Sequence, residues 1–127
     1  MTSAPKPRPK YYDLNLANLP PAGILSILHR GSGAFLFLAI PLFLYVLQAA
    51  LSQESEYLHW RKILSDPMVK LILLGGFWLF AHHFFAGIRY LFLDVHVGVE
   101  KEASRQSAIV VLVAGIVATL VVGAVYW

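Results

Sequence analysis

Two histidines and an arginine interrupt a strongly apolar stretch between Leu79 and Asp94, which reads LFAHHFFAGIRYLFLD. These side chains belong to His82, His83 and Arg89. Ionisable groups at membrane depth are costly, so each marks a functional site by default. A histidine can coordinate a metal, relay protons or hydrogen-bond at a helix contact, whereas an arginine stays charged and needs an anion, a carbonyl oxygen or water. This stretch is therefore the first candidate for chemistry in the chain.

Helical periodicity separates these side chains into two stripes about 100° apart. One stripe, at i, i+4, i+7 and i+11, contains His83, Gly87, Tyr90 and Asp94. The other stripe contains His82, Ala86, Arg89 and Leu93. A glycine one turn after His83 lets a flat, bulky ligand approach the backbone, so His83 is the better candidate for ligation. His82 is expected to pack or hydrogen-bond at a helix interface.

A second polar group lies near the start of the first apolar segment. Four of its residues fall at i, i+3, i+4 and i+7, on one helix face: Ser26, His29, Arg30 and Gly33. The serine alone could bond to carbonyls of its own helix, and the arginine alone could extend to lipid headgroups. A histidine beside an arginine, with a glycine one turn deeper clearing space, favours a site for the anionic group of a cofactor.

The composition is that of a membrane protein, because 58% of the 127 residues are hydrophobic and 13% are charged. A spanning helix needs about 20 apolar residues. Three segments satisfy this requirement, and we expect helices over about 22–51, 67–94 and 104–127. The expected fold is all-α and integral to the membrane, with residues 22–127 as the transmembrane domain and residues 1–21 as a cytoplasmic arm.

Lysine and arginine are more numerous on one side of the predicted spans. Seven of them flank the N-terminal side and the second loop, whereas three flank the first loop. Positive charge is retained in the cytoplasm, so we expect a cytoplasmic N-terminus and an outward C-terminus. The first two spans then run antiparallel, and their polar groups meet at the cytoplasmic face. The net charge of +3 reflects this topology and requires no nucleic-acid partner.

The other segments are expected to be structural. Residues 52–66 have the pattern of an amphipathic segment at the membrane surface, with Trp60 at headgroup level. The apolar part of the last span, residues 108–127, carries no charge, and its Gly115 and Gly123 permit close packing against a neighbouring helix.

The chain has no cysteine, which excludes disulfides, thiolate zinc sites, iron–sulfur clusters and covalent haem within it. A metal would have to be held by histidine or carboxylate. Because His83 lies at the same membrane face as His29 and Arg30, the residues suit a haem whose anionic propionates meet basic side chains. Met68 lies at the opposite end of its segment, so the second axial ligand is expected from another chain.

Three motifs carry a family resemblance. They are SILHRGSG at residues 26–33, H-x3-G-I-R with a trailing acid at residues 83–94, and RP-x3-DL at residues 8–14. Together, in this order and with three spans, they resemble the larger membrane-anchor subunit of succinate dehydrogenase, the cytochrome b subunit of complex II. The likeness covers nearly the whole chain. It implies an anchor subunit in the bacterial inner membrane that is not an enzyme in isolation.

The resemblance also implies partners and a cofactor. A second, smaller three-helix anchor would share one haem b with this chain, each subunit giving one axial histidine, here His83. Electrons from succinate would pass from the flavoprotein subunit through the iron–sulfur subunit to ubiquinone. In the family, residues matching His29 and Arg30 approach the haem propionates, and residues matching Ser26, Ile27 and Arg30 form part of the ubiquinone pocket.

Two further residues have supporting roles by this resemblance. Asp94 is expected to contact Arg30 from the end of the second span. Many members of the family have histidine after Gly-Ile-Arg, where this chain has Tyr90, which can still donate a hydrogen bond.

Two alternatives stay open on the sequence. One is an anchor of the fumarate reductase type, which has the same architecture with electron flow reversed. The other is a non-redox membrane transport or assembly subunit in which His82, His83 and Arg89 relay protons or bind a substrate.

Overall fold

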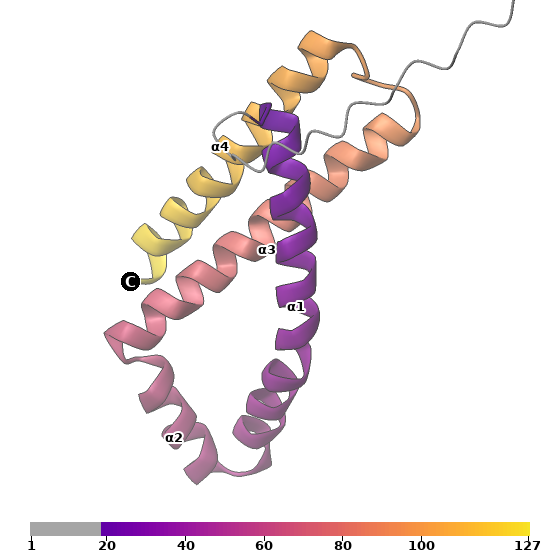
Figure 1. Cartoon of the computed structure of the whole chain (residues 1–127). Helices are drawn as coiled ribbons and strands as arrows, with labels where there is room; N and C mark the ends of the chain where they lie inside the picture. Colours follow the sequence, from indigo (N-terminus) through magenta and orange to yellow (C-terminus); the bar gives the residue numbers. More distant parts are fainter. Residues whose placement is uncertain (1–18) are drawn as a thin grey trace, which may run out of the picture.

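A computed structural model describes residues 19–127. The predicted arm over 1–21, including the RP-x3-DL motif, therefore lies almost entirely outside the described residues. Four helices form this part of the chain: α1 (Pro21–Ser52), α2 (Glu54–Leu64), α3 (Pro67–Asp94) and α4 (Lys101–Tyr126) (Figure 1). Among the described residues, α1, α3 and α4 are long and apolar enough to cross a membrane. The all-α fold with three spans is confirmed.

The ends of the long helices follow ordinary capping chemistry. Pro21 and Pro67 occupy first-turn positions, where the missing N–H of proline costs no hydrogen bond. The side chain of Asp66 caps α3 by accepting from the backbone N–H groups of Met68 and Val69 at 2.9 and 3.3 Å. The start of α4 was predicted at about residue 104, but this helix begins at Lys101, because its first turns are polar and extend beyond the apolar stretch.

The predicted amphipathic segment contains a helix of its own, α2, which was not predicted as a helix from the sequence. Its 11 residues place Glu54 and Glu56 in the first turn and Arg61 and Lys62 in the last turn. This order of charges complements the helix dipole at both ends. Trp60 of α2 meets Tyr45 of α1 edge to face, with ring centroids 6.1 Å apart. The helix therefore packs back on the end of the first span.

The three long helices converge at one end of the molecule (Figure 1). There α1 begins, α3 ends and α4 begins, whereas at the other end α1 and α3 diverge and α2 connects them (Figure 1). Buried side chains lie in the convergent halves of these helices: Leu25, Ser32, Ala81, His82, Ala86, Arg89, Ala108 and Val111. The predicted antiparallel arrangement of the first two spans is confirmed, and the packed core coincides with the predicted polar face.

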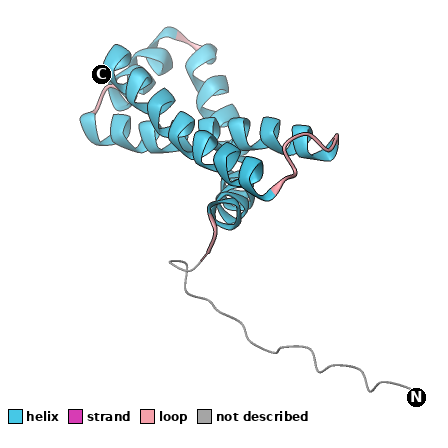
Figure 2. Cartoon of the chain, turned by 90° about the horizontal axis from the view of Figure 1, so that it is seen from above, coloured by secondary structure: helices cyan, strands magenta, loops and turns pink. Residues whose placement is uncertain are grey.

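Small residues bring α3 and α4 together. A Cβ atom at Gly115 would lie 3.4 Å from the Cα atom of His82, and one at Gly123 would lie 3.3 Å from a methyl carbon of Leu74. Both glycines of the last span thus permit the close packing that the sequence predicted. The connections between the described helices are short (Figure 2).

The connection from α3 to α4 begins with a left-handed helix cap. The N–H of Val97 donates to the carbonyl of Phe92 and the N–H of His96 donates to the carbonyl of Leu93, both at 2.9 Å. His96 has φ 63°, in the position that glycine usually occupies in this motif. The cap ends α3 sharply and directs the chain towards α4.

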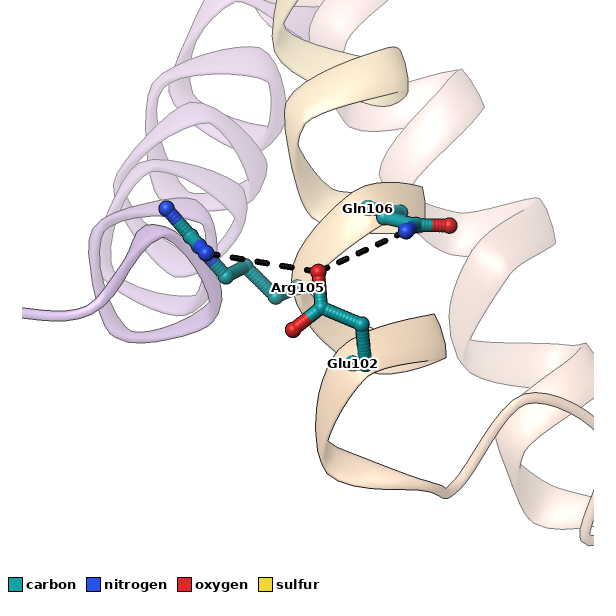
Figure 3. Close-up of polar contacts among 3 residues, drawn as sticks. All are labelled: Glu102, Arg105 and Gln106. Carbon is teal, nitrogen blue, oxygen red and sulfur yellow. Dashed lines mark hydrogen bonds and ion pairs between the residues drawn. The ribbon is translucent and has the colours of Figure 1, made fainter.

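Polar side chains cover the first turns of α4. One carboxylate oxygen of Glu102 lies 4.0 Å from Nη1 of Arg105 and accepts a hydrogen bond from Gln106 at 3.4 Å (Figure 3). These side chains are exposed, which fits a helix start in water or among headgroups rather than in the hydrocarbon layer.

Candidate functional site

His83 lies half-buried on α3 against the first half of α1. Its Nδ1 atom is 3.1 Å from the carbonyl oxygen of His29 and 3.2 Å from Oγ of Ser32. A carbonyl oxygen can only accept, so Nδ1 carries the proton and donates to it. Nε2 then keeps its lone pair, which is the form of imidazole that coordinates a metal.

Gly33 makes the close approach of this imidazole possible. A Cβ atom at Gly33 would lie 2.8 Å from Cε1 of His83, a separation that real Cβ atoms do not adopt. The sequence favours an anionic cofactor group in the space beside Gly33. In the structure that space holds the His83 ring itself. The missing side chain of Gly33 therefore lets the candidate ligand His83 pack against α1.

Three aromatic rings gather at the crossing of α1 and α3, and we call them the ring cluster: His29, His83 and Tyr90. The rings of His29 and His83 are stacked, with centroids 4.3 Å apart and an interplanar angle of 13°. The Tyr90 ring lies 5.0 Å from that of His29. A Cβ atom at Gly87 would lie 3.8 Å from Nε2 of His29, so the space above Gly87 is occupied by His29.

Ser26, Ile27 and Arg30 lie on neighbouring turns near the start of α1. The Nε–H of Arg30 donates to the carbonyl of Ser26 at 3.3 Å, and the arginine side chain is otherwise exposed. Ile27 is 45% exposed. The predicted contact between Arg30 and Asp94 is not formed: among residues 19–127 the ion pair present is Arg105 with Glu102. Asp94 is exposed at the last turn of α3.

His82 is buried in the packed core of the bundle, where its backbone and Cβ lie against Gly115 of α4. It is 1% exposed, and within residues 19–127 neither of its ring nitrogens has a hydrogen-bond partner. Trp78, one turn earlier, lies with its ring centroid 5.8 Å from that of His82. The two adjacent histidines thus have different surroundings, as their separation on the helix predicted.

Arg89 fastens α3 to α4. Its Nε–H donates to Oγ of Ser107 at 2.9 Å, and Nη2 donates to the carbonyl and to Oγ of Ser104 at 3.0 and 2.9 Å. The arginine is 6% exposed. Its hydrogen bonds therefore go to α4, and no hydrogen-bonded chain joins Arg89 to His82 and His83 among the described residues.

Ser32 is a residue that the sequence analysis did not single out. It is 1% exposed, and its hydroxyl lies between the carbonyl of His29 and Nδ1 of His83. The sequence feature that could have pointed to Ser32 is its place three residues after His29 in the SILHRGSG motif. Serines in membrane helices commonly bond to their own carbonyls, so that signal did not indicate a contact with another helix.

Metal binding by this chain alone is not supported within residues 19–127. No three His, Cys, Asp or Glu side chains gather there in a way that could hold an ion. A single imidazole can supply one ligand to the iron of a haem.

These features define a class of protein: a small helical membrane protein with three spans and a single imidazole ligand candidate held where two antiparallel spans cross. The sequence model of the family described as "Succinate dehydrogenase/Fumarate reductase transmembrane subunit" matches residues 4–122. The chain belongs to this family, and the resemblance seen in its motifs is confirmed.

Relatives of known identity agree with this assignment. Three proteins named succinate dehydrogenase cytochrome b556 subunit are similar to the chain. The protein of Coxiella burnetii is 35% identical over 121 residues, which cover 94% of this chain and 97% of the relative. The protein of Paracoccus denitrificans is 32% identical over 101 residues (80% and 78%), and that of Rickettsia felis is 28% identical over 113 residues (89% and 88%).

Proposed function

We propose that this membrane-anchor cytochrome b subunit of succinate dehydrogenase contributes His83 as one axial ligand of a haem b shared with a second anchor subunit. We also propose that Ser26, Ile27 and Arg30 form its part of a ubiquinone site supplied with electrons by the iron–sulfur subunit. The observation that carries the proposal is the hydrogen bond from Nδ1 of His83 to a backbone carbonyl, which leaves Nε2 available.

The chemistry of His83 fits a haem. Its ring is half-buried between two spans, and its tautomer is set by the His29 carbonyl. Relatives of the chain are named cytochrome b556 subunits, which describes a b-type haem protein. When bound, the haem supplies a one-electron redox centre beside the quinone site. The small anchor subunit would supply the second ligand to the haem iron.

His29 and Arg30 are the basic side chains next to His83 on α1, and we propose that they meet the haem propionates. The His29 ring already stacks on that of His83. Apart from its Nε–H, the guanidinium of Arg30 bonds to no other described residue and is exposed. Tyr90, at the edge of the ring cluster, supports the position of His29.

The proposed quinone-site residues Ile27 and Arg30 are exposed on the surface of this chain. Ser26 and Arg30 are one turn apart, and the bond from Nε–H of Arg30 to the Ser26 carbonyl orients the guanidinium while its terminal nitrogens stay free. An arginine there stabilises negative charge that develops on a quinone oxygen, and the Ser26 hydroxyl orients the ring by a hydrogen bond and relays a proton from the aqueous side to the quinone. Because Ile27 is 45% exposed, partner chains must complete the pocket.

The proposed function also implies an orientation of the chain in the membrane. The N-terminus and the polar end of the bundle face the cytoplasm of a bacterial inner membrane, where the iron–sulfur and flavoprotein subunits dock. The arm over 1–21 and Asp94 lie on that side. The family description names fumarate reductase as well as succinate dehydrogenase, so an anchor that works in the fumarate-reducing direction is the second candidate.

Arg30→Leu tests the quinone assignment in the assembled complex. We expect loss of succinate:ubiquinone reductase activity by a factor of at least about 100, since one charge-stabilising donor is worth that much in related chemistry. Succinate oxidation by an artificial dye should stay intact, because it does not use the anchor. Arg105→Leu, at an exposed arginine of α4, serves as the control. Unchanged quinone reduction in Arg30→Leu would refute the assignment.

A further inference from the structure

We propose that Ser32 is a positioning residue that fixes the imidazole of His83 and lowers the midpoint potential of the haem. This inference rests on the proposed function, because it requires a haem at His83. It assigns a role to a buried hydroxyl that the quinone chemistry does not use.

The geometry commits the Ser32 hydroxyl to one orientation. Its O–H donates to the His29 carbonyl at 2.9 Å, and Oγ lies 3.2 Å from Nδ1 of His83. A hydroxyl has a single hydrogen, and here that hydrogen goes to the carbonyl. The oxygen lone pairs therefore face the N–H of His83, which shares its hydrogen between Ser32 Oγ and the His29 carbonyl. Ser32 is 1% exposed, so this contact is shielded from solvent.

Ordinary back-bonding within a helix does not account for this contact. Ser52 makes the same bond to a carbonyl three residues earlier, from its Oγ to Ala49 at 2.7 Å. Ser52, however, is exposed at the end of α1 and bonds to no other described helix. Ser32 differs because its oxygen is buried between α1 and α3 and meets a ring nitrogen on the other helix.

Two acceptors on Nδ1–H have a predictable effect on a ligand. They increase the electron density that the imidazole donates through Nε2, and they hold the ring in one orientation. A more strongly donating axial ligand stabilises the ferric state more than the ferrous state, so the midpoint potential falls. Removing the Ser32 oxygen leaves the His29 carbonyl as a single acceptor, which keeps the tautomer but weakens the donation.

The test is a redox titration of the haem α-band in the purified complex carrying Ser32→Ala. We expect the band to persist and the midpoint potential to rise relative to the unaltered complex. Ser52→Ala, which removes a back-bonding hydroxyl without a histidine partner, should leave the potential unchanged. Ser32→Thr, which keeps the hydroxyl, should restore it.

A second variant keeps the test decisive if Ser32→Ala does not assemble. Ser32→Cys preserves the side-chain size but offers a weaker acceptor, so it should also raise the potential. Unchanged potentials in Ser32→Ala or Ser32→Cys, with an intact α-band, would overturn the role of Ser32 and leave the haem proposal standing. Absence of a b-type band from the unaltered complex would instead overturn the haem proposal itself.

Discussion

At the scale of single residues, His83 is oriented by a backbone carbonyl and a hydroxyl of the neighbouring helix rather than by a carboxylate. Both partners come from the helical turn of His29 to Ser32. A backbone carbonyl cannot be titrated, so the imidazole keeps one tautomer without a buried negative charge. This arrangement suits a ligand at membrane depth, where an unpaired carboxylate would be costly.

Gly33→Ala tests the contact that admits this imidazole. The added Cβ would lie 2.8 Å from Cε1 of His83, so the ring must move off its hydrogen bonds. We expect most of the bound haem to be lost and the complex to be destabilised by about 1–3 kcal/mol. The haem-to-protein ratio measures the first effect, and thermal inactivation in detergent measures the second.

Gly31→Ala is the matched control for that substitution, because a Cβ atom at Gly31 meets nothing within 4 Å. It should retain haem and lose no stability, since alanine favours the helix over glycine by about 1 kcal/mol. Equal haem content in the two variants would contradict the structural role of Gly33.

The sequence alone could separate His82 from His83, because neighbouring positions on a helix differ by a fixed rotation. It also indicated that Gly33 clears space. It could not say what fills that space, since the contact joins residues from two helices whose crossing point is set by packing. The bond between Ser32 and His83 was missed for the same reason, and the expected pairing of Arg30 with Asp94 is not formed.

At the scale of elements, one buried arginine joins α3 to α4. Arg89 makes three hydrogen bonds to Ser104 and Ser107, before the apolar part of α4 begins. Close packing at Gly115 continues the contact deeper in the bundle. The position of α4 therefore depends on a polar clamp at one end and on small residues along its length.

Arg89→Met should weaken this clamp while keeping a long apolar side chain. Hydrogen bonds to charged groups contribute about 1.5–3 kcal/mol each, and part of the loss is offset by apolar packing, so we expect a net destabilisation of about 2–4 kcal/mol. The measurement is the midpoint of thermal or urea inactivation of the complex. Arg105→Met removes an exposed pair (Figure 3) and should cost at most about 1 kcal/mol. Similar losses in both variants would contradict the clamp.

The elements themselves were largely predictable, because membrane thickness fixes how long an apolar helix must be. The three spans lie close to their expected bounds. The helix α2 was seen as an amphipathic segment but not as a helix, since its 11 residues carry charges of both signs and no long apolar run. Its capping charges, Glu54 and Glu56 before Arg61 and Lys62, were the signal for a helix.

At the scale of the whole molecule, the packed core occupies one end of the bundle, and long apolar side chains cover the rest. Exposed examples on α1 and α3 are Phe37, Leu38, Phe43, Leu44, Ile72 and Phe84. In a membrane these surfaces face lipid or other subunits. The half-buried His83 and the open quinone residues are consistent with a bundle that is completed by a second anchor.

The topology can be tested because the chain has no cysteine. Single cysteines at Ser55 of α2 and at Ala103 of α4, both exposed, should report opposite membrane faces. We expect a membrane-impermeant maleimide to label the Ser55→Cys variant from the periplasmic side. The Ala103→Cys variant should be labelled from the cytoplasmic side alone. The reverse pattern would overturn the orientation, and labelling of both from one side would overturn the number of spans.

The most direct measurement is the reduced visible spectrum of the purified complex carrying His83→Leu beside one carrying His82→Leu. We predict that the b-type α-band disappears in His83→Leu and persists in His82→Leu, because His82 is enclosed in the packed core at 1% exposure, whereas His83 is half-buried. A band that survives in His83→Leu, or one that vanishes in an assembled His82→Leu complex, would contradict the assignment of the haem to His83.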